Sequence, residues 1–489
     1  MSARVQILWY DYETSGRDAA ADRPIQMGWQ LTDPGMEPLA DTQSLLIRLP
    51  DDVLPSPGAM LVHQILPERH QREGVSEAQL AFHLESLIAP RTLVAGYNSR
   101  GFDDKFTQHV FYRSLRDPYA WQYADGRGRF DLYPVVLSYF VFAPAAIRWP
   151  EDHDGRPRFK LDRIGPLNQL DQGLTRAHDA ASDVTVTARL ARQLALYDAD
   201  LFASCLKRID KHFVTDQIRA DGRSEGLLEV TPFAGWERGF VRDCWIPFRL
   251  SERSNDYVAF DLNRDPQEVM AGLIALAESE SSDLHETRKQ AYALGLHTIR
   301  INAQPMLFRR GTLDADVKAR LEGFGRDEAM QNQHLEIWQH IQESPAFKQL
   351  YQLAVTIFSE PQQSVPDDVD LALYSGRFLS SHDKDLLAGL PLMNAEALSE
   401  LDLAFDDVRY PELFFRYRAR NFPQSLSQSE WKRWQKVRRD KLMGISTAQT
   451  AASRVQDELM EISQRSDLEP HQIELLQQFA HWLDHQPPV

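Results

Sequence analysis

The first 200 residues alternate short apolar runs, typical of strands, with longer amphipathic runs, typical of helices. The runs VQILWYDYE near the N-terminus, LLIRL from Leu45 and TLVAGYN from Thr92 have the composition of strands. Residues 76–88 show helical periodicity behind a serine cap, and residues 184–196 form an amphipathic run rich in Ala and Leu. This alternation predicts an α/β layer structure whose last helix closes a first domain.

The pattern changes beyond residue 200. Four short β-like runs follow, interrupted by one helical segment at 268–278, and they indicate a small barrel or sandwich. The runs are GLLEVTPF from Gly226, FVRDCWIPF from Phe240, DYVAFDL from Asp256 and HTIRIN from His297. The polar, Pro-containing segment 361–370 has the composition of a linker or exposed loop, and the chain beyond it is mostly helical in pattern, most clearly in WKRWQKVRR and in residues 455–483. We therefore expect three domains, at 1–199, 200–355 and 356–489.

Length and composition limit the class of protein. A chain of 489 residues is too long for one ordinary hydrophobic core. It has no apolar run long enough to cross a bilayer, and its N-terminus lacks the pattern of a signal peptide, so we expect a cytoplasmic protein with no membrane role. The cysteines, Cys205 and Cys244, show neither metal-ligand spacing nor a disulfide framework, and we expect them to be structural.

The formal net charge of −17 describes solubility and does not exclude one basic groove that binds a polyanion. Residues 416–441 contain a run of basic side chains that could form such a surface. The run comprises Arg416, Arg418, Arg420, Lys432, Arg433, Lys436, Arg438, Arg439 and Lys441. On charge alone, a solvated helix face is the more common explanation for such a run.

Two carboxylates end the first predicted strand. Alternation places Val5, Ile7, Trp9, Asp11 and Glu13 on one face, so Asp11 and Glu13 leave the strand together. Two neighbouring carboxylates repel each other unless a cation neutralises them, and ligands that are all oxygen suit Mg²⁺ or Mn²⁺. Alone, Asp-x-Glu is a weak signal that is most often surface charge.

Two further acidic positions follow later in the chain. Asp103 comes after the third predicted strand, where it could begin a helix and simply cap it. His178 and Asp183 precede and open the helix at 184–196, about one turn apart, so both could face one cleft. A single histidine before a helix is usually polar surface.

The order of these elements carries more information than any one of them. Asp-x-Glu on a first strand, Asn-x-x-x-Phe-Asp midway and His-x-x-x-x-Asp opening the last helix resembles the histidine-bearing branch of the DEDD superfamily of 3′→5′ exonucleases. The resemblance to the exodeoxyribonuclease I family covers nearly the whole chain. Its phrases include YDYETSG, ADRPIQ, LPSPGAMLVHQI, GYNSRGFDD, FYRSLRDPYAW, AHDAASDV, GWERGFVRDCWIPF and RYRARNFP.

The resemblance implies a ribonuclease H-like α/β exonuclease domain, an SH3-like β-rich domain and an α-helical C-terminal domain. It makes Asp11, Glu13, Asp103 and Asp183 the ligands of two Mg²⁺ ions, for which Mn²⁺ can substitute, and it makes His178 the general base. Glu13 would also touch the 3′-terminal nucleotide. The stretch RPRFKLD carries Lys160 where the family leads us to expect Arg, so a bidentate phosphate contact is lost there. Arg416, Arg418 and Arg420 are further candidates for substrate binding.

The implied activity is processive 3′→5′ degradation of single-stranded DNA to 5′-mononucleotides, in DNA repair and recombination. The resemblance also implies binding of the acidic C-terminal tail of single-stranded-DNA-binding protein, and we expect a monomer. Two alternatives remain. One is an exoribonuclease or small-oligonucleotide nuclease on the same catalytic fold, which the roughly 290 additional residues disfavour. The other is a non-catalytic DNA-binding scaffold, which the filled catalytic positions disfavour.

Overall fold

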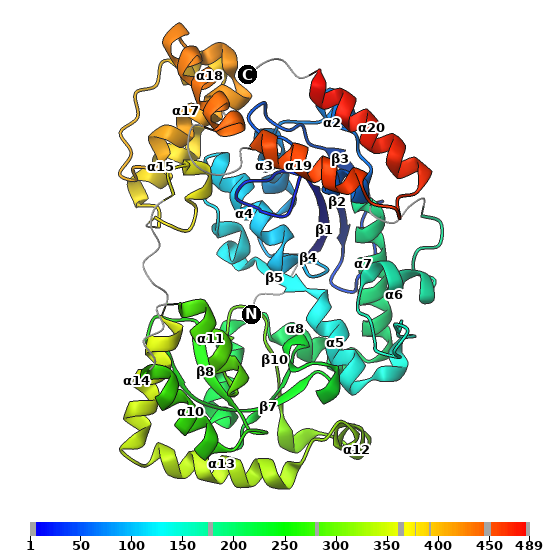
Figure 1. Ribbon diagram of the computed structural model, residues 1–489, viewed down its shortest axis with the longest axis vertical. Helices are drawn as coiled ribbons and strands as arrows, with labels where there is room; N and C mark the ends of the chain where they lie inside the picture. The colour runs from blue at the N-terminus through cyan, green and yellow to red at the C-terminus, as the bar shows by residue number, and fades with distance from the viewer. Residues whose placement is uncertain are drawn as a thin grey trace. The chain divides into compact units, whose positions relative to one another are not determined.

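The computed structural model of the protein describes residues 6–174, 179–278, 283–359, 366–376, 378–390, 393–444 and 451–485 (Figure 1). The chain forms two compact units, each assembled from separate stretches of sequence. Unit 1 comprises residues 1–129, 171–189 and 363–489, and unit 2 comprises residues 130–170 and 190–362. The three-domain division expected from the sequence stays a prediction. No helix among the described residues is long and apolar enough to span a membrane.

A five-stranded sheet of order β3-β2-β1-β4-β5 forms the centre of unit 1. Its strands are β1 (Gln6–Thr14), β2 (Pro24–Thr32), β3 (Gln43–Leu46), β4 (Thr92–Gly96) and β5 (Gly128–Asp131). Strand β1 runs antiparallel to β2 and parallel to β4. The sheet and its helices confirm the α/β structure expected from the sequence.

Helices surround this sheet and continue through the C-terminal part of unit 1. They are α1 (Pro57–His63), α2 (Pro67–Glu73), α3 (Glu77–Leu87), α4 (Asp103–Arg113), α7 (Ala180–Tyr197), α15 (Ser381–Gly389), α16 (Ala395–Ser399), α17 (Tyr410–Asn421), α18 (Gln428–Met443), α19 (Ala451–Ser463) and α20 (Pro470–Asp484). The C-terminal region is helical, as expected, and residues 455–483 belong to two helices, α19 and α20. The second of these helices starts anew at residue 470, because Glu469 caps α20 and Pro470 occupies its first turn.

Side chains along β1 alternate between two faces of the sheet, and one of these faces packs against helices. Leu8, Tyr10 and Tyr12 are buried in a cluster with residues of α3 and α4, among them Leu84 and Phe106. Their hydroxyl groups find partners there: Tyr10 donates to Asp104 over 2.7 Å, and the Tyr12 oxygen lies 3.1 Å from that of Thr107. The other face of β1 therefore carries Asp11 and Glu13, as the period of two requires.

Unit 2 contains a second sheet, which is antiparallel throughout and has the order β10-β6-β7-β8-β9. Its strands are β6 (Leu227–Val230), β7 (Val241–Arg249), β8 (Asp256–Asp261), β9 (Leu296–Arg300) and β10 (Met306–Arg309). The helices of this unit are α5 (Leu132–Phe142), α6 (Leu161–Leu167), α8 (Ala199–Lys207), α9 (Lys211–Gln217), α10 (Pro266–Glu278), α11 (Leu284–Ala293), α12 (Ala315–Gly323), α13 (Glu328–Gln342) and α14 (Ala346–Phe358).

The region 200–355 is thus more helical than its β-like runs indicate. The predicted helix at 268–278 is α10, but α11, α13 and α14 also contribute to the core that covers the sheet. Trp245 of β7 stacks on Trp338 of α13, with ring centroids 5.2 Å apart and planes 14° from parallel. Trp338 and Leu335 are buried, three residues apart, on a helix whose other positions are mainly polar. Such sparse apolar spacing gives a weak helical signal in sequence.

A buried cluster of charged side chains joins the C-terminal helices of unit 1 to its N-terminal part. We call Asp52, Asp370, Arg420 and Lys441 the buried ion cluster. Arg420 bonds both carboxylates, at 2.6 Å to Asp52, and Lys441 lies 2.9 Å from Asp52 and 2.8 Å from Asp370. Asp52 and Asp370 have almost fully buried side chains. A buried charge is unfavourable unless an opposite charge lies beside it. These contacts therefore hold the C-terminal helices of unit 1 against its N-terminal part.

The three arginines proposed as DNA contacts lie inside this region. Arg416 pairs with Asp368, Asp370 and Glu412, while Arg418 pairs with Glu430. The side chains of Arg416, Arg418 and Arg420 are 9%, 8% and 5% exposed. Their guanidinium groups are already neutralised by carboxylates and turned away from solvent. These ion pairs indicate a structural role for the three arginines and do not support their assignment to substrate binding.

The pKa values of the two buried carboxyls follow from this pairing. Burial by itself would raise the pKa of Asp370, but the charges of Arg420 and Lys441 outweigh it and hold that pKa well below its usual range. The same balance lowers the pKa of Asp52. A carboxyl whose pKa is lower in the folded state stabilises that state fully at pH values above its unfolded-state pKa of about 3.9. This contribution is lost as the pH falls through the folded-state pKa.

Replacing Arg420 with Met should destabilise unit 1 by about 3–5 kcal/mol at neutral pH, because Asp52 and Asp370 would remain buried with too little positive charge. Arg433→Met is the matched control: Arg433 pairs with Glu412, but its side chain is 55% exposed, and such a pair is worth about 0–1 kcal/mol. The measurement is urea unfolding followed by tryptophan fluorescence, since Arg420 lies 5.7 Å from the ring of Trp434. Equal midpoints for the two variants would contradict a stabilising role for the cluster.

Candidate active site

Three carboxylates from distant parts of the sequence meet at the end of β1. Asp11, Glu13 and Asp183 each place one oxygen within 4.8 Å of the others, and all three are partly exposed. Asp11 and Glu13 lie on the same face of β1, two residues apart, whereas Asp183 is in the first turn of α7. The meeting of these three residues was expected from their order in the sequence.

Asp103, the fourth predicted carboxylate, lies next to this group. It is the first residue of α4, and its carboxylate accepts a hydrogen bond from the backbone N–H of Tyr12 over 3.1 Å. Tyr12 stands between Asp11 and Glu13, so this bond ties the start of α4 to the acidic end of β1. Asp103 is not the N-cap residue, because Phe102 occupies that position, but it lies in the first turn, where the helix dipole favours a carboxylate.

Gly28 of β2 allows α7 to approach the sheet. It pairs with Asp11 in the β1–β2 register. A Cβ atom at Gly28 would lie 2.3 Å from the carbonyl carbon and oxygen of Ala180, the first residue of α7. Only glycine leaves room for the helix backbone here, and this close contact is what places Asp183 beside Asp11.

Gln26 holds the segment just before α7. Its side-chain amide donates to the Asp179 carboxylate over 2.7 Å, and its oxygen accepts from the N–H of Ala180 over 3.4 Å. Gln26 is buried and pairs with Glu13 in the β1–β2 register. Asp179 in turn accepts hydrogen bonds from the N–H and hydroxyl of Ser182, at 3.3 Å each. Hydrogen bonds thus join the start of α7 to β2, the strand next to β1 and its carboxylates.

The site has an excess of negative charge. Burial raises the pKa of Asp11 well above its ordinary value, and the neighbouring charges of Asp103, Asp183 and Glu13 raise it further. Repulsion of this kind is relieved when a divalent cation is bound between the carboxylates, and the all-oxygen donor set fits a hard ion such as Mg²⁺ or Mn²⁺. Asp11, Glu13, Asp103 and Asp183 are therefore suited to hold divalent metal.

The other predicted site residues are His178, Lys160, Arg416, Arg418 and Arg420. His178 lies outside the described residues. Lys160 is an exposed residue of unit 2 that precedes α6, and Arg416, Arg418 and Arg420 are occupied by the ion pairs described above. Sequence reasoning also missed Gln26 and Gly28. Both lie in the quoted phrase ADRPIQ or just after it, yet a polar residue and a glycine within one apolar strand give no sign of a partner 150 residues later.

The two ends of the chain each match a family model. Residues 8–191 match a family described as exonuclease, and residues 367–486 match the exonuclease I C-terminal domain. Together these models span more than half of the chain.

Similar proteins carry one name. The exodeoxyribonuclease I of Escherichia coli (strain K12) is 32% identical over 445 residues, which cover 88% of this chain and 89% of that protein. The Haemophilus influenzae exodeoxyribonuclease I is 30% identical and covers 88% of this chain and 90% of that protein. Among solved structures, Escherichia coli exonuclease I in complex with a dA16 oligonucleotide superposes with a TM-score of 0.86 at 29% identity, over 98% of this chain and 99% of that one.

The acidic group on an exonuclease fold, the C-terminal domain and the full-length similarity agree with one another and confirm the resemblance found in the sequence: the chain belongs to the exodeoxyribonuclease I family of divalent-metal-dependent 3′→5′ exonucleases.

Proposed function

We propose that the protein hydrolyses single-stranded DNA from the 3′ end, releases 5′-mononucleotides processively, and acts in DNA repair and recombination. The observation that carries this proposal is the acidic group of Asp11, Glu13 and Asp183 beside Asp103. The oligonucleotide complex of the similar Escherichia coli enzyme supports single-stranded DNA as the substrate. We further propose two Mg²⁺ ions as the cofactors, with Mn²⁺ able to substitute, and a monomer in the cytoplasm.

In this proposal the four carboxylates hold the metal and orient the substrate. When bound, the ions supply positive charge at the scissile phosphate and acidify the attacking water. His178 takes the proton of that water, since the imidazole pKa of about 6.5 suits proton transfer near neutral pH. Glu13, at the end of β1, also contacts the 3′-terminal nucleotide. Lys160 neutralises a phosphate as a point charge.

The experiment that tests the proposal uses single-stranded DNA labelled at its 5′ end. A ladder that shortens from the 3′ end, only with added Mg²⁺ or Mn²⁺, is expected. Unlabelled DNA added as a trap after initiation reports processivity, because a processive enzyme finishes the strand that it already holds. Faster digestion of labelled RNA would favour the exoribonuclease alternative, and binding without any digestion would favour the non-catalytic scaffold.

Asp183→Asn should reduce turnover of single-stranded DNA by more than about 100-fold, since even the outer partners of metal ligands are worth about 10- to 100-fold. DNA binding should persist, because no carboxylate is needed to attract a polyanion. Asp41→Asn is the control, as it removes the same charge from an exposed residue of unit 1 outside the acidic group. Initial rates and filter binding make the comparison. Near wild-type turnover by Asp183→Asn at saturating Mg²⁺ would remove Asp183 from the site.

We also propose that Gln26 is a positioning residue. Its two hydrogen bonds join β2 to Asp179 and Ala180, and Asp183 lies in the first turn of the same helix. A small shift of that turn would move the Asp183 carboxylate relative to Asp11 and Glu13. Because bound metal depends on the separation of its ligands, the hydrogen bonds of Gln26 should affect metal affinity more than DNA affinity.

Gln26→Leu should therefore lower kcat about 10- to 100-fold and raise the Mg²⁺ concentration that gives half-maximal rate, with KM for DNA little changed. Gln30→Leu, a second buried glutamine of β2, controls for the loss of an amide from this strand. The measurement is a Mg²⁺ titration of initial rate, together with thermal unfolding of both variants. A loss of activity that follows the loss of thermal stability equally in both variants would show that Gln26 is only structural.

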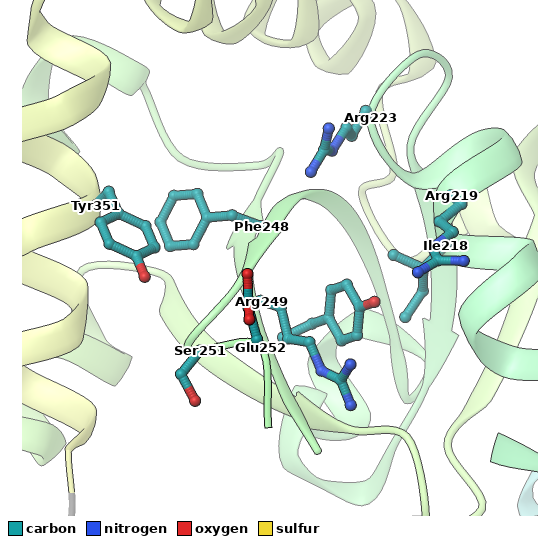
Figure 2. A pocket seen from close by; sticks show the side chains of 9 residues that line it. Ile218, Arg219, Arg223, Phe248, Arg249, Ser251, Glu252 and Tyr351 are labelled. Carbon is teal, nitrogen blue, oxygen red and sulfur yellow. The ribbon is translucent and has the colours of Figure 1, made fainter. Parts of the chain in front are cut away.

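The proposed binding of the acidic tail of single-stranded-DNA-binding protein finds a candidate pocket in unit 2. This cavity of about 500 Å³ combines three arginines, Arg219, Arg223 and Arg249, with aromatic rings. Figure 2 shows Phe248 and Tyr351 side by side, and their ring centroids are 5.0 Å apart. Arg219 and Arg223 are exposed. A peptide that carries carboxylates and an apolar end would pair its charges with the arginines and place its apolar side chains against the rings.

A labelled peptide with an acidic sequence and an apolar C-terminus should bind saturably at low salt and weaken as salt is added. Replacing both Arg219 and Arg223 with Ala should weaken it roughly 2- to 30-fold, if each exposed charge pair is worth about 0.2–1 kcal/mol. The control replaces Arg264 and Lys289, two exposed cations of unit 2 outside the pocket, with Ala. Fluorescence anisotropy measures the affinity. Equal weakening in both double variants would place the tail elsewhere.

A further inference from the structure

Three side chains of unit 2 form a second group of possible metal ligands. Glu229 lies on β6, Cys244 on β7 and His297 on β9. The Cys244 Sγ lies 3.8 Å from His297 Nε2 and 4.0 Å from Glu229 Oε2, and His297 Nε2 lies 3.1 Å from the same Glu229 oxygen. All three ligand atoms therefore face one point.

The pleat of the sheet explains this convergence. Cys244 and Ala259 belong to the same buried face, and Ala259 of β8 pairs with His297 in the register. Strand β8 separates β7 from β9, and its residues on this face are Asp261, which pairs with Cys244, and Ala259, which pairs with His297. The small side chain of Ala259 lets the His297 imidazole reach toward Cys244, and their Nε2 and Sγ atoms are 3.8 Å apart. On the other side, Glu229 of β6 pairs with Arg242, two residues before Cys244 and on the same face of β7.

The distances match those of a tetrahedral zinc site. With bonds of about 2.3 Å to sulfur and about 2.0–2.1 Å to nitrogen or oxygen, tetrahedral geometry separates S from N or O by about 3.5 Å and N from O by about 3.3 Å. The observed separations of 3.8, 4.0 and 3.1 Å differ from these by half an ångström or less. Small movements of side chains would complete the site.

We propose that Glu229, Cys244 and His297 bind a zinc-class divalent ion, with a water as the fourth ligand. A thiolate and an imidazole select borderline-soft ions such as Zn²⁺ or Co²⁺, whereas the all-oxygen active site selects Mg²⁺ or Mn²⁺. The chain would therefore have two different kinds of metal site, each with donor atoms suited to a different class of ion.

Charge and protonation agree with a divalent ion. A thiolate and a carboxylate supply two negative charges, which balance the ion. Cys244 is fully buried and His297 is 3% exposed, so a charge there must be compensated. The ligand is the thiolate, so binding of the ion releases the thiol proton of Cys244. Arg242, 3.7 Å from Glu229 Oε2, neutralises that carboxylate when no ion is bound.

The ion would have a structural consequence. It would connect β6, β7 and β9, of which β7 and β9 are not neighbours in the sheet. A ligand that binds only the folded state raises the free energy of unfolding by an amount set by its concentration and affinity. We therefore expect zinc to raise the thermal stability of unit 2.

The test is a Co²⁺ titration of the full chain in excess Mg²⁺, which occupies the carboxylates of the active site. A thiolate bound to Co²⁺ gives a near-ultraviolet charge-transfer band, and tetrahedral Co²⁺ gives strong visible bands. The chain has two cysteines, both buried, so Cys205→Ser is the matched control. We expect these bands in the wild type and in Cys205→Ser, their loss in Cys244→Ser and on addition of Zn²⁺, and a rise in melting temperature with Zn²⁺ that Cys244→Ser lacks.

Two outcomes would overturn the proposal. If the wild type gives no charge-transfer band, or if Cys244→Ser retains it, the three residues are a hydrogen-bonded structural cluster. His297→Gln provides a second route should Cys244→Ser fail to fold: it keeps the thiol but removes the imidazole, so the visible bands should weaken and the affinity for Co²⁺ should fall at least tenfold. An unchanged titration of His297→Gln would exclude the histidine as a ligand.

Discussion

The arrangement of unit 1 depends on one constraint: four carboxylates that repel each other must be held at the end of a single strand. The raised pKa of Asp11 records that repulsion. Backbone alternation in β1 supplies two of the four groups, the hydrogen bond from Tyr12 N–H fixes a third, and the close contact of α7 with Gly28 brings the fourth. Packing of Leu8, Tyr10 and Tyr12 on the opposite face of β1 provides the favourable free energy that offsets the repulsion.

Several basic side chains of unit 1 form internal ion pairs, although their clustering in the sequence suggests a surface that binds a polyanion. The chain carries 17 more acidic than basic charges, and several of its arginines are bonded to buried carboxylates instead of facing solvent. Arg420 and Lys441 fix the helices α17 and α18 to Asp52, which lies more than 360 residues earlier. The basic residues of α17 and α18 therefore connect the C-terminal helices of unit 1 to its N-terminal part.

Much of the fold follows from local pattern, and so does half of the site. Alternation in VQILWYDYE places Asp11 and Glu13 on one face. Helix α7, which contains Asp183 in its first turn, begins at Ala180, four residues before the predicted start at 184. Arg420 was misassigned because a run of basic residues in a helix looks the same whether its partners are phosphates or buried aspartates from a distant segment. Gln26 was missed for the same physical reason, since its partner Asp179 is remote in the chain.

The proposed zinc-class site of unit 2 shows most clearly why distant contacts cannot be predicted from local sequence. Zinc sites are recognised in sequence by short spacings between ligands on one loop or helix, and neither cysteine has such a spacing. Glu229, Cys244 and His297 are separated by 15 and 53 residues. What brings them together is the order of strands in a sheet and the small side chain of Ala259, properties that belong to the tertiary structure. Ligands spread over several strands need no local motif, because the pleat alone aligns their side chains on one face.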